Sequence, residues 1–281
     1  EAKITTTVLL NGVTKEHVHS ITVVPEEGNV VVKEFNYDFR NVGFPDRPEY
    51  TQPGWRVVGL PSDRPVLGFQ PSFGINIGTT GIGQGRSFEF DVPETGEYLL
   101  HFRAQKYSAG GIGAIQIDGR TVGEYNFYQP SGASRVVEPI HIMHLEKGTH
   151  LLSLEVIGKP EEAPDSPAYR MTASRFILEM LAELPDLSDV SLAIDDAELY
   201  VGSMAQLHVT GTTDEGVTSD IFNHQITFES EDPQIVTVDA STGKLTATGV
   251  GTTEVIVFVE KDGELISDSL SINVQTIENA K

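Results

Sequence analysis

The feature that most constrains the fold of this chain is a series of short runs in which apolar side chains occupy every second position. In GEYLLHFRAQ (residues 96–105), one alternate set is apolar throughout: Tyr98, Leu100, Phe102 and Ala104. HLLSLEVIG (150–158) and SLSINV (269–274) repeat the pattern between turn residues. This period of two, with many β-branched residues, is typical of half-buried strands.

Helical periodicity is almost absent from the sequence. SRFILEMLAEL (174–184) would also suit a helix, but Phe176, Leu178 and Met180 alternate, so a strand is predicted over Arg175–Met180. The fold class predicted from the sequence is therefore all-β.

The strand candidates fall into blocks. Seven of them follow Val190 within about 90 residues, the scale of an immunoglobulin-like sandwich. LPDLSD (184–189) is predicted to be a short linker before them. The predicted domains are residues 26–184, a larger block with its own series of strands, and residues 185–281, an immunoglobulin-like β-sandwich.

Residues 1–25 contain a spacing that recurs near the other end. The turn Asn11-Gly12 precedes Ser20 by nine residues, and the turn at Asp262 precedes Ser271 by nine residues. Such repetition is typical of modular arrays. We interpret residues 1–25 as the closing hairpin of a preceding immunoglobulin-like repeat; the alternative is an unrelated hairpin or N-terminal strands, since Asn-Gly turns are common. The chain is expected to be a mature product or a fragment of a longer protein.

Composition excludes several classes of partner. Forty-one acidic against nineteen basic residues give a formal charge of −22, which opposes binding to nucleic acid or anionic lipid. There is no cysteine, so disulfides and thiolate metal sites are excluded. No run reaches the roughly 18 apolar residues that span a bilayer, so membrane insertion is not expected.

The C-terminal block carries a recognisable motif. DEGVTSDIFNHQITFESEDPQIVTVDASTGKLTATGVGTTEVIVFV (214–259) resembles the group 2 bacterial immunoglobulin-like domain, through Gly216, Thr218, Asp220, Phe228, Ser230, Asp232, Pro233, Ile235, Val236, Val238, Asp239, Gly243, Leu245, Thr246, Gly249, Gly251, Thr252 and Thr253. Phe228 stands where the family usually has tryptophan. The resemblance implies a spacer of secreted or surface proteins, and therefore a secreted or bacterial cell-surface location.

The larger block resembles a different family. RSFEFDVPETGEYLLHFRAQKYSAGGIGAIQIDGRTVGEYNFYQ (86–129), LEKGTHLLSLEVIG (145–158) and RFILEML (175–181) are similar to galactose-binding-like jelly-roll carbohydrate-binding modules of families 6 and 35. The matching residues are mostly core and turn positions. The families often carry an aromatic platform followed by an Asn late in the fold, whereas PAYRMTASRFIL (167–178) has Tyr169 and no Asn.

Sugar binding needs flat apolar faces and flanking polar groups. The candidate carbohydrate-binding residues are Tyr107, Tyr128, Trp55, Gln105, Lys106, Arg103, Asn126 and Gln129. For an anionic polysaccharide, Arg103, Lys106, Arg86 and Arg135 could pair with carboxylates. The alternative is that Tyr125 and Phe127 point inward and only Tyr128 is exposed, and that Trp55 is a core anchor.

Other chemistry has weaker support. His141 and His144 are three apart, which on a strand points them to opposite faces. Asp195-Asp196 and Asp214-Glu215 could bind a structural calcium ion, or could form a solvated face. No other cofactor is expected, and no two carboxylates can be paired as acid and base from the sequence.

The function expected from the sequence is a non-catalytic carbohydrate-binding module with an immunoglobulin-like spacer. It would target a secreted, multimodular polysaccharide-degrading enzyme to a polysaccharide, with the catalytic domain elsewhere in the same parent chain. The alternatives are a structural stalk or adhesin segment without a sugar ligand, and a lyase or hydrolase within residues 26–183.

Overall fold

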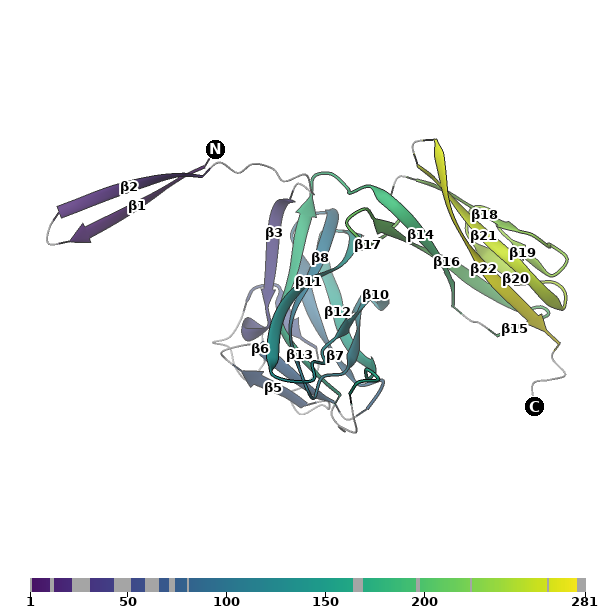
Figure 1. Ribbon diagram of the computed structural model, residues 1–281, viewed down its shortest axis with the longest axis horizontal. Coiled ribbons are helices and arrows are strands. Elements are labelled where there is room, and N and C mark those ends of the chain that lie inside the picture. Colours follow the sequence, from purple (N-terminus) through teal and green to yellow (C-terminus); the bar gives the residue numbers. More distant parts are fainter. Residues whose placement is uncertain are drawn as a thin grey trace.

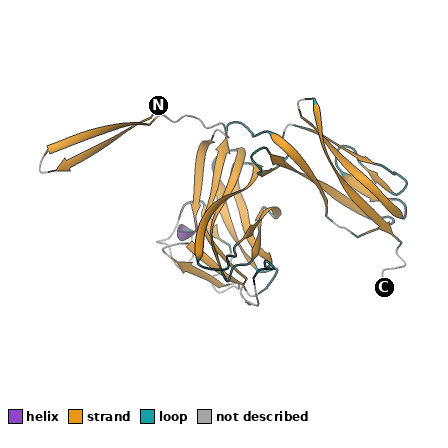
Figure 2. Ribbon diagram, in the orientation of Figure 1, coloured by secondary structure: helices purple, strands orange, loops and turns teal. Residues whose placement is uncertain are grey.

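The computed structural model describes residues 2–10, 13–21, 31–42, 52–58, 66–70, 74–79, 81–163, 169–195, 198–222, 224–261 and 263–276. Over these residues the chain is built from strands and one 3₁₀ turn, η1 (Phe39–Asn41), without an α-helix (Figure 2). The all-β fold class is confirmed. Two sandwiches follow a separate hairpin along the chain (Figure 1).

The first sandwich is the predicted jelly roll. Its strands are β3 (Val31–Asp38), β4 (Trp55–Val57), β5 (Val66–Gln70), β6 (Gly74–Thr79), β7 (Gly85–Val92), β8 (Gly96–Tyr107), β9 (Ile112–Ile117), β10 (Arg120–Asn126), β11 (Ala133–Leu145), β12 (Gly148–Gly158) and β13 (Tyr169–Leu181). The order β10-β9-β12-β7-β4 forms what we call the small sheet. The large sheet has the order β11-β8-β13-β6-β5, with β3 also paired to β13.

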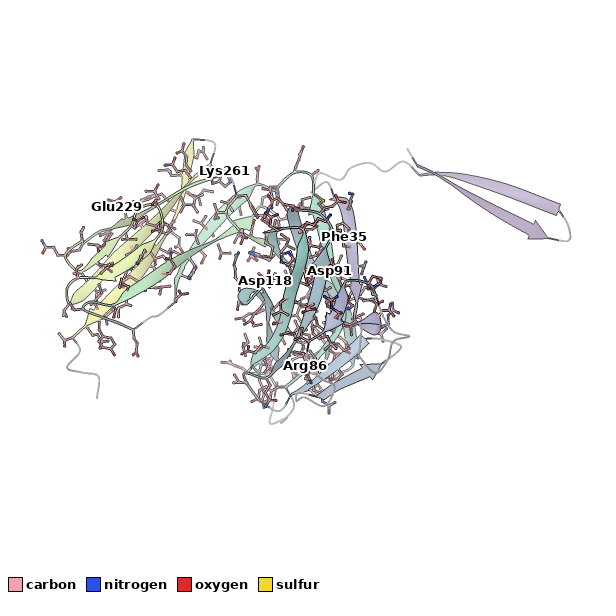
Figure 3. All side chains as sticks on the ribbon, turned by 180° about the vertical axis from the view of Figure 1, so that it is seen from behind. Phe35, Arg86, Asp91, Asp118, Glu229 and Lys261 are labelled. Atoms are coloured by element: carbon pink, nitrogen blue, oxygen red, sulfur yellow. The ribbon has the colours of Figure 1, made fainter. Side chains whose placement is uncertain are left out.

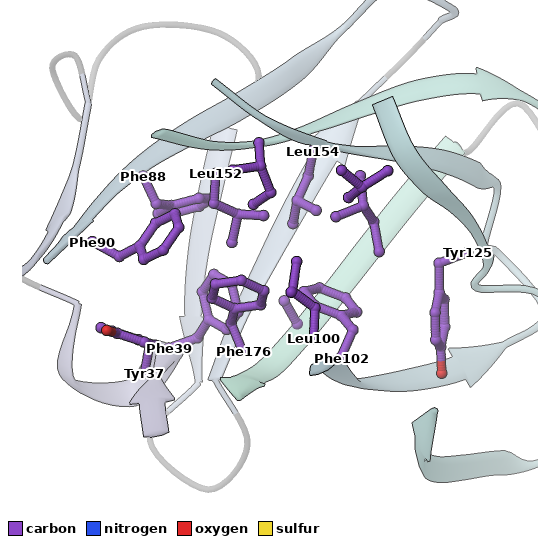
Figure 4. Close-up of a cluster of buried hydrophobic side chains, with 14 of the residues drawn as sticks. Tyr37, Phe39, Phe88, Phe90, Leu100, Phe102, Tyr125, Leu152, Leu154 and Phe176 are labelled. Carbon is purple, nitrogen blue, oxygen red and sulfur yellow. The ribbon is translucent and has the colours of Figure 1, made fainter. Parts of the chain in front are cut away.

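The alternation predicted from the sequence places the core between these sheets. On β8, Tyr98, Leu100, Phe102 and Ala104 are buried, and Phe88 and Phe90 face them from β7 (Figure 4). Phe39 meets Phe88 edge-on at 5.1 Å between ring centroids. Rings that meet edge-to-face add to the free energy gained from burial alone.

Two local features of this sandwich follow from its sequence. The ambiguous segment around Phe176 is a strand, since β13 runs through it and Phe176 is 1% exposed. The turn between β9 and β10 is Asp118-Gly119, with φ of 52° and 83°. Both residues need the left-handed region, which Asp tolerates and Gly prefers, so this Asp-Gly pair fixes a tight hairpin.

The second sandwich contains β14 (Leu187–Ile194), β15 (Leu199–Tyr200), β16 (Met204–Thr213), β17 (Thr218–Ser219), β18 (Gln225–Ser230), β19 (Val236–Val238), β20 (Lys244–Ala247), β21 (Gly251–Lys261) and β22 (Glu264–Gln275). One sheet has the order β15-β22-β21-β18, and β14, β16, β17, β19 and β20 form the other. Phe228 is 6% exposed in its core. The expected linker is shorter than predicted, because β14 begins at Leu187, which is buried in this core.

The N-terminal hairpin consists of β1 (Ala2–Leu10) and β2 (Val13–Ile21), which pair antiparallel. Leu10 pairs with Val13 across the turn, as Lys261 pairs with Glu264 between β21 and β22. Within the described residues β1 and β2 pair only with each other. The shared turn length agrees with the spacing read from the sequence, while the assignment of residues 1–25 to a preceding repeat stays a prediction.

Candidate functional site

Three of the predicted site residues lie together on the outer face of the large sheet. Phe102 and Ala104 of β8 point into the core, so Arg103, Gln105 and Tyr107 point outward. The same alternation on β13 buries Met171 and directs Arg170 and Thr172 outward. We call this surface the outer face.

Four arginines from three strands gather on the outer face. The sequence has ten arginines, all between residues 40 and 175, and these four are Arg103, Arg135, Arg170 and Arg175. Arg103 on β8 is directly opposite Arg175 on β13. Arg135 on β11 is opposite Gln105, two residues along β8 from Arg103. The pairing therefore places a basic patch on a chain that is strongly acidic as a whole.

The arginines at the centre of this patch differ from those elsewhere in the jelly roll. Arg40, Arg56 and Arg120 form ion pairs with Asp38, Glu89 and Asp220. In contrast, no carboxylate of the described residues forms an ion pair with Arg103 or Arg175. The charge of Arg175 does act on Asp38, on the neighbouring strand β3. Burial would raise the pKa of Asp38, but hydrogen bonds from Arg40 and the charges of Arg40 and Arg175 outweigh it and lower this pKa.

Tyr107 lies flat across this face. Its hydroxyl oxygen accepts a hydrogen bond of 3.3 Å from Thr172 on β13, and it also bonds the side chains of Arg170 and Asn76. Since neighbouring strands are about 4.8 Å apart, a ring that starts on β8 and reaches these groups must extend along the sheet rather than away from it. Burial raises the pKa of Tyr107, against the opposing effects of Thr172 and Arg170, so the phenol is neutral near pH 7.

Asn76 adds an unsatisfied acceptor. It lies on β6 opposite Thr172, and its Oδ1 is buried without a hydrogen-bond partner among the described residues. A buried acceptor without a donor costs free energy, and an internal water molecule could supply the missing donor. The exposed part of the face thus combines guanidinium groups and an aromatic ring, which can hold a polar, anionic ligand without chemical change.

Lys106, which the sequence predicted to be a site residue, points to the opposite side of β8 from Arg103. Its Nζ is 2.8 Å from Glu138 Oε1 and 5.0 Å from the centroid of the Tyr125 ring. Tyr125 is 1% exposed and Phe127 is 0% exposed, as the alternative interpretation of EYNFY held. Lys106 is therefore paired within the sandwich and does not join the outer face.

Tyr128 and Gln129 meet the backbone of Tyr107, and Asn126 ends the strand β10 that leads to them. Tyr107 N–H donates to Phe127 O at 3.0 Å, and Gln129 N–H donates to Tyr107 O at 3.2 Å. Their polar groups serve their own loop: Asn126 Oδ1 accepts from Tyr128 N–H, and the Gln129 amide donates to Ser131 O. The Tyr128 hydroxyl donates to Glu162 O. A role of these three residues in binding stays a prediction.

The prediction of Trp55 as a binding platform is wrong. Trp55 is 0% exposed, stacks on Phe88 with centroids 5.4 Å apart, and donates from Nε1 to Asp38 O at 3.1 Å. β4 pairs with β7 on the small sheet, which turns the indole into the core. Its only polar atom is satisfied there, so the ring cannot contact a sugar.

Arg86 is also displaced from the predicted anion site. It lies on the core side of β7 in register with Leu154 and is 7% exposed (Figure 3). The alternation on β7 buries every second residue from Arg86 to Val92. Arg86 is thus inaccessible from the outer face.

The two histidines of HIMH have different surroundings. His141 is buried and bonds residues of the second sandwich, whereas His144 is exposed between Glu97 and Glu146. Hydrogen bonds that His144 donates to Glu146 and Glu97 raise its pKa, against a smaller opposing effect of burial. The described residues contain no group of three or more metal-binding side chains, and a calcium ion at Asp195 or Asp214 stays a prediction.

Sequence reasoning missed half of the outer face: Asn76, Arg170, Thr172 and Arg175. A signal for Arg175 existed, because the alternation that buries Phe176 and Leu178 places Arg175 on the opposite side. No local signal identifies Asn76, since its position depends on the pairing of β6 with β13.

Comparison with known families identifies the second sandwich. Residues 189–266 match the family described as bacterial Ig-like domain (group 2). The C-terminal module is therefore a bacterial immunoglobulin-like domain of this group, as the motif in residues 214–259 predicted. No curated protein matches the chain.

Similarity to solved structures extends over more of the chain at low identity. A Paenibacillus xanthan lyase is 15% identical with a TM-score of 0.40, covering 94% of this chain and 26% of the lyase. The CBM36-1 domain of a multidomain xylanase from the hindgut metagenome of Trinervitermes trinervoides is 12% identical with a TM-score of 0.30, covering 54% of this chain and 100% of that domain. A Podospora anserina GH26-CBM35 β-(1,4)-mannanase is 12% identical with a TM-score of 0.32, covering 60% of this chain and 32% of the mannanase. This chain thus spans about a quarter of the length of the lyase.

Proposed function

We propose that the chain is a non-catalytic, polysaccharide-binding region of a secreted multimodular protein. The jelly-roll module binds an anionic polysaccharide on the outer face of its large sheet, and the immunoglobulin-like module serves as a spacer. A catalytic domain elsewhere in the parent chain would act on the retained polymer, whose local concentration the binding module raises.

The observation that carries this proposal is the opposed pair Arg103 and Arg175, neither of which forms an ion pair with a carboxylate of the described residues. Tyr107 lies on the same outer face, four residues along β8 from Arg103. Guanidinium groups pair with carboxylates through two parallel hydrogen bonds, and aromatic faces contact the C–H side of a pyranose ring. An acidic sugar presents both kinds of partner. A neutral sugar would bring no carboxylate to the two arginines.

The net charge of the chain determines the ionic strength at which binding should be tested. A net charge of −22 repels an anionic polymer at long range. At an ionic strength of about 0.1 M the Debye length falls to about 10 Å, so the distant carboxylates are largely screened while contacts on the outer face remain.

The test is affinity electrophoresis of the whole chain in gels containing polygalacturonate, alginate or xanthan, with neutral xylan and mannan as comparisons. We expect retardation by at least one acidic polymer and none by the neutral ones. The double variant Arg103→Gln, Arg175→Gln should lose the retardation, whereas Arg56→Gln should keep it, because Arg56 pairs with Glu89 on the small sheet. Absence of retardation by every polymer, or an unaffected double variant, would contradict the proposal.

A structural stalk or adhesin segment is the second candidate. It is favoured by the β1–β2 hairpin, in which Leu10 pairs with Val13 as Lys261 pairs with Glu264 between β21 and β22 of the immunoglobulin-like module. A two-stranded hairpin is only marginally stable alone, so these strands would complete another module of an array. Binding of no glycan, together with end-to-end modules in the parent protein, would favour this function.

A further inference from the structure

The outer face of the large sheet has two ends of opposite character. Near Tyr107 it is polar, as described above. At the other end the outward positions are apolar, since Leu99 lies four residues before Arg103 on β8 and pairs with Ile142 on β11. Leu100 belongs to the jelly-roll core, so its neighbour Leu99 points away from that core. On an isolated jelly roll, Leu99 and Ile142 would therefore face water.

A small apolar cluster covers this end of the sheet. Its buried members and the two residues packed against them are Leu99, Ile142, Leu181, Val217, Leu184 and Phe222. The first three come from the jelly roll, whereas Val217 and Phe222 come from the immunoglobulin-like module. Leu99 is only 6% exposed, although its strand directs it away from the jelly-roll core. Removal of this apolar surface from water therefore favours contact between the two modules.

A strand pairing continues the large sheet into the second module. Among the jelly-roll strands of this sheet β11 is the outermost, and β17 pairs with it in parallel through Ile142 and Ser219. β17 also pairs antiparallel with β16 of the immunoglobulin-like module (Figure 1). Asp220 N–H donates to Ile142 O at 2.9 Å, and the Thr218 hydroxyl donates to Ile140 O at 2.9 Å. We call this pairing, together with the apolar cluster, the joint.

Polar side chains also meet across the joint. His141 on β11 is 2% exposed, with Nδ1 at 2.9 Å from Thr218 Oγ1 and Nε2 at 2.9 Å from Asp220 Oδ1. Arg120 Nη1 on β10 donates to Asp220 Oδ2 at 3.0 Å, and Arg120 Nη2 lies 3.4 Å from His141 Nε2. Hydrogen bonds depend on direction as well as on distance, so these contacts restrict the angle between the modules in a way that apolar contact alone does not.

We propose that the immunoglobulin-like module is docked on the jelly roll as a rigid part of one body, rather than joined to it by a flexible linker. Motion between modules is the usual behaviour unless their interface is well packed. Here the connection is short, since β13 ends at Leu181 and β14 begins at Leu187. Leu184, in the middle of this connection, packs against the apolar cluster. The connection itself is thus held in the joint and does not act as a free hinge.

The joint also fixes the second module relative to the proposed binding surface. β11 carries both Arg135 of the outer face and Ile142 of the joint. A polysaccharide on the outer face would therefore be held at one orientation relative to the immunoglobulin-like module. This consequence rests on the proposed function, whereas the rigid arrangement of the modules does not and can be tested without a ligand.

The absence of cysteine allows spin labels to be placed at chosen positions. The pair Val137→Cys and Ser271→Cys spans the two modules, and the pair Val137→Cys and Thr149→Cys lies within the jelly roll; all three positions are exposed on strands. Double electron–electron resonance on the whole chain should give distance distributions of equal width for the two pairs. A distribution between the modules that is much broader than the one within the jelly roll would overturn the proposal.

Val217→Asp tests the contribution of the apolar cluster. The new carboxylate would be buried without a partner, so the distribution between the modules should broaden while that within the jelly roll stays narrow. Val217 lies outside the core of the immunoglobulin-like module, which should therefore stay folded. The matched control is Val201→Asp, at a valine of the same module that is 39% exposed, and it should leave both distributions narrow. Unchanged width in Val217→Asp, or equal broadening in Val201→Asp, would contradict the proposal.

Amide hydrogen exchange gives a second measurement on the chain without labels. Asp220 N–H is bonded to Ile142 O across the joint, so its exchange requires the joint to open. In the wild-type chain it should exchange at least about 100-fold more slowly than an unstructured amide, and Val217→Asp should remove this protection. Exchange of the Asp220 amide at the unstructured rate in the wild-type chain would equally overturn the proposal.

Discussion

Arg103 on β8 and Arg175 on β13 occupy directly opposed positions in the large sheet, and both point away from the core. Like charges opposite each other on neighbouring strands destabilise a sheet, by an amount of order 0.2–1 kcal/mol. Packing gives no reason for this arrangement, because neither side chain contributes to the core. Asp38 on β3 lies opposite Arg175 and offsets part of the repulsion. An anion bound between the two arginines, as proposed above, would offset more of it.

The pair should therefore cost stability in the free protein. We expect Arg103→Gln to leave the free energy of unfolding unchanged or to raise it by about 0.2–1 kcal/mol, while it weakens binding to an acidic polysaccharide. Urea titration followed by circular dichroism gives the first quantity, and affinity electrophoresis gives the second. If Arg103→Gln instead lowers the free energy of unfolding by several kcal/mol, Arg103 has a structural role. That result would contradict the proposal that the outer face binds an anion.

The fold was largely predictable from local pattern. Alternation on β8 correctly separated the inward Phe102 from the outward Arg103, and the motif around Phe228 identified the immunoglobulin-like module. These features repeat every second residue or lie within one hairpin. Their physical cause is therefore contained in a short window of sequence.

What the sequence did not reveal depends on contacts between distant segments. Trp55 is buried because β4 pairs with β7, and the two modules are in contact where Thr218 meets Ile140 across 78 positions of the chain. The outer face likewise combines β6, β8, β11 and β13. Pairing of this kind is not encoded in a local period, so the exposed or buried state of a single aromatic residue could not be decided.

A second prediction concerns the fluorescence of Trp55, which is the sole tryptophan of the chain. Its emission should be that of a buried indole, and it should not shift when polysaccharide binds to the outer face. Trp55→Ala should destabilise the jelly roll by about 3–5 kcal/mol, because a large ring and its hydrogen bond to Asp38 are lost. The emission wavelength is checked by fluorescence titration with the polymer that retards the chain. A ligand-induced shift would show that Trp55 does take part in binding.

Gly243 in the immunoglobulin-like module is expected to tolerate no side chain. It has φ of +69°, and a Cβ there would lie 2.8 Å from the Phe228 ring. Gly243→Ala should combine backbone strain with displacement of that ring, for a loss of about 2–3 kcal/mol. Gly263→Ala is the matched control, since φ is +86° but nothing lies within 4 Å of the added carbon. Differential scanning calorimetry should show the larger loss of melting temperature for Gly243→Ala, and equal losses would exclude contact with Phe228 as the cause.

Asp220 should make the protein sensitive to strong acid. Burial alone would raise its pKa, but the bonds from His141 and Arg120 lower it from 3.8 to about 2. A carboxyl group whose pKa is lowered by folding stabilises the protein above its ordinary pKa, and this contribution disappears as the pH falls through the lowered value. The shift corresponds to a free energy of order 2 kcal/mol, from a side chain that is 21% exposed.

Asp220→Asn should therefore lower the melting temperature at about pH 7, and the difference from the wild type should vanish near pH 2. Asp195→Asn, which neutralises an exposed carboxylate of the immunoglobulin-like module, should change the melting temperature little at either pH. A constant difference between Asp220→Asn and the wild type down to pH 2 would show that the carboxylate is not the charged partner of His141 and Arg120.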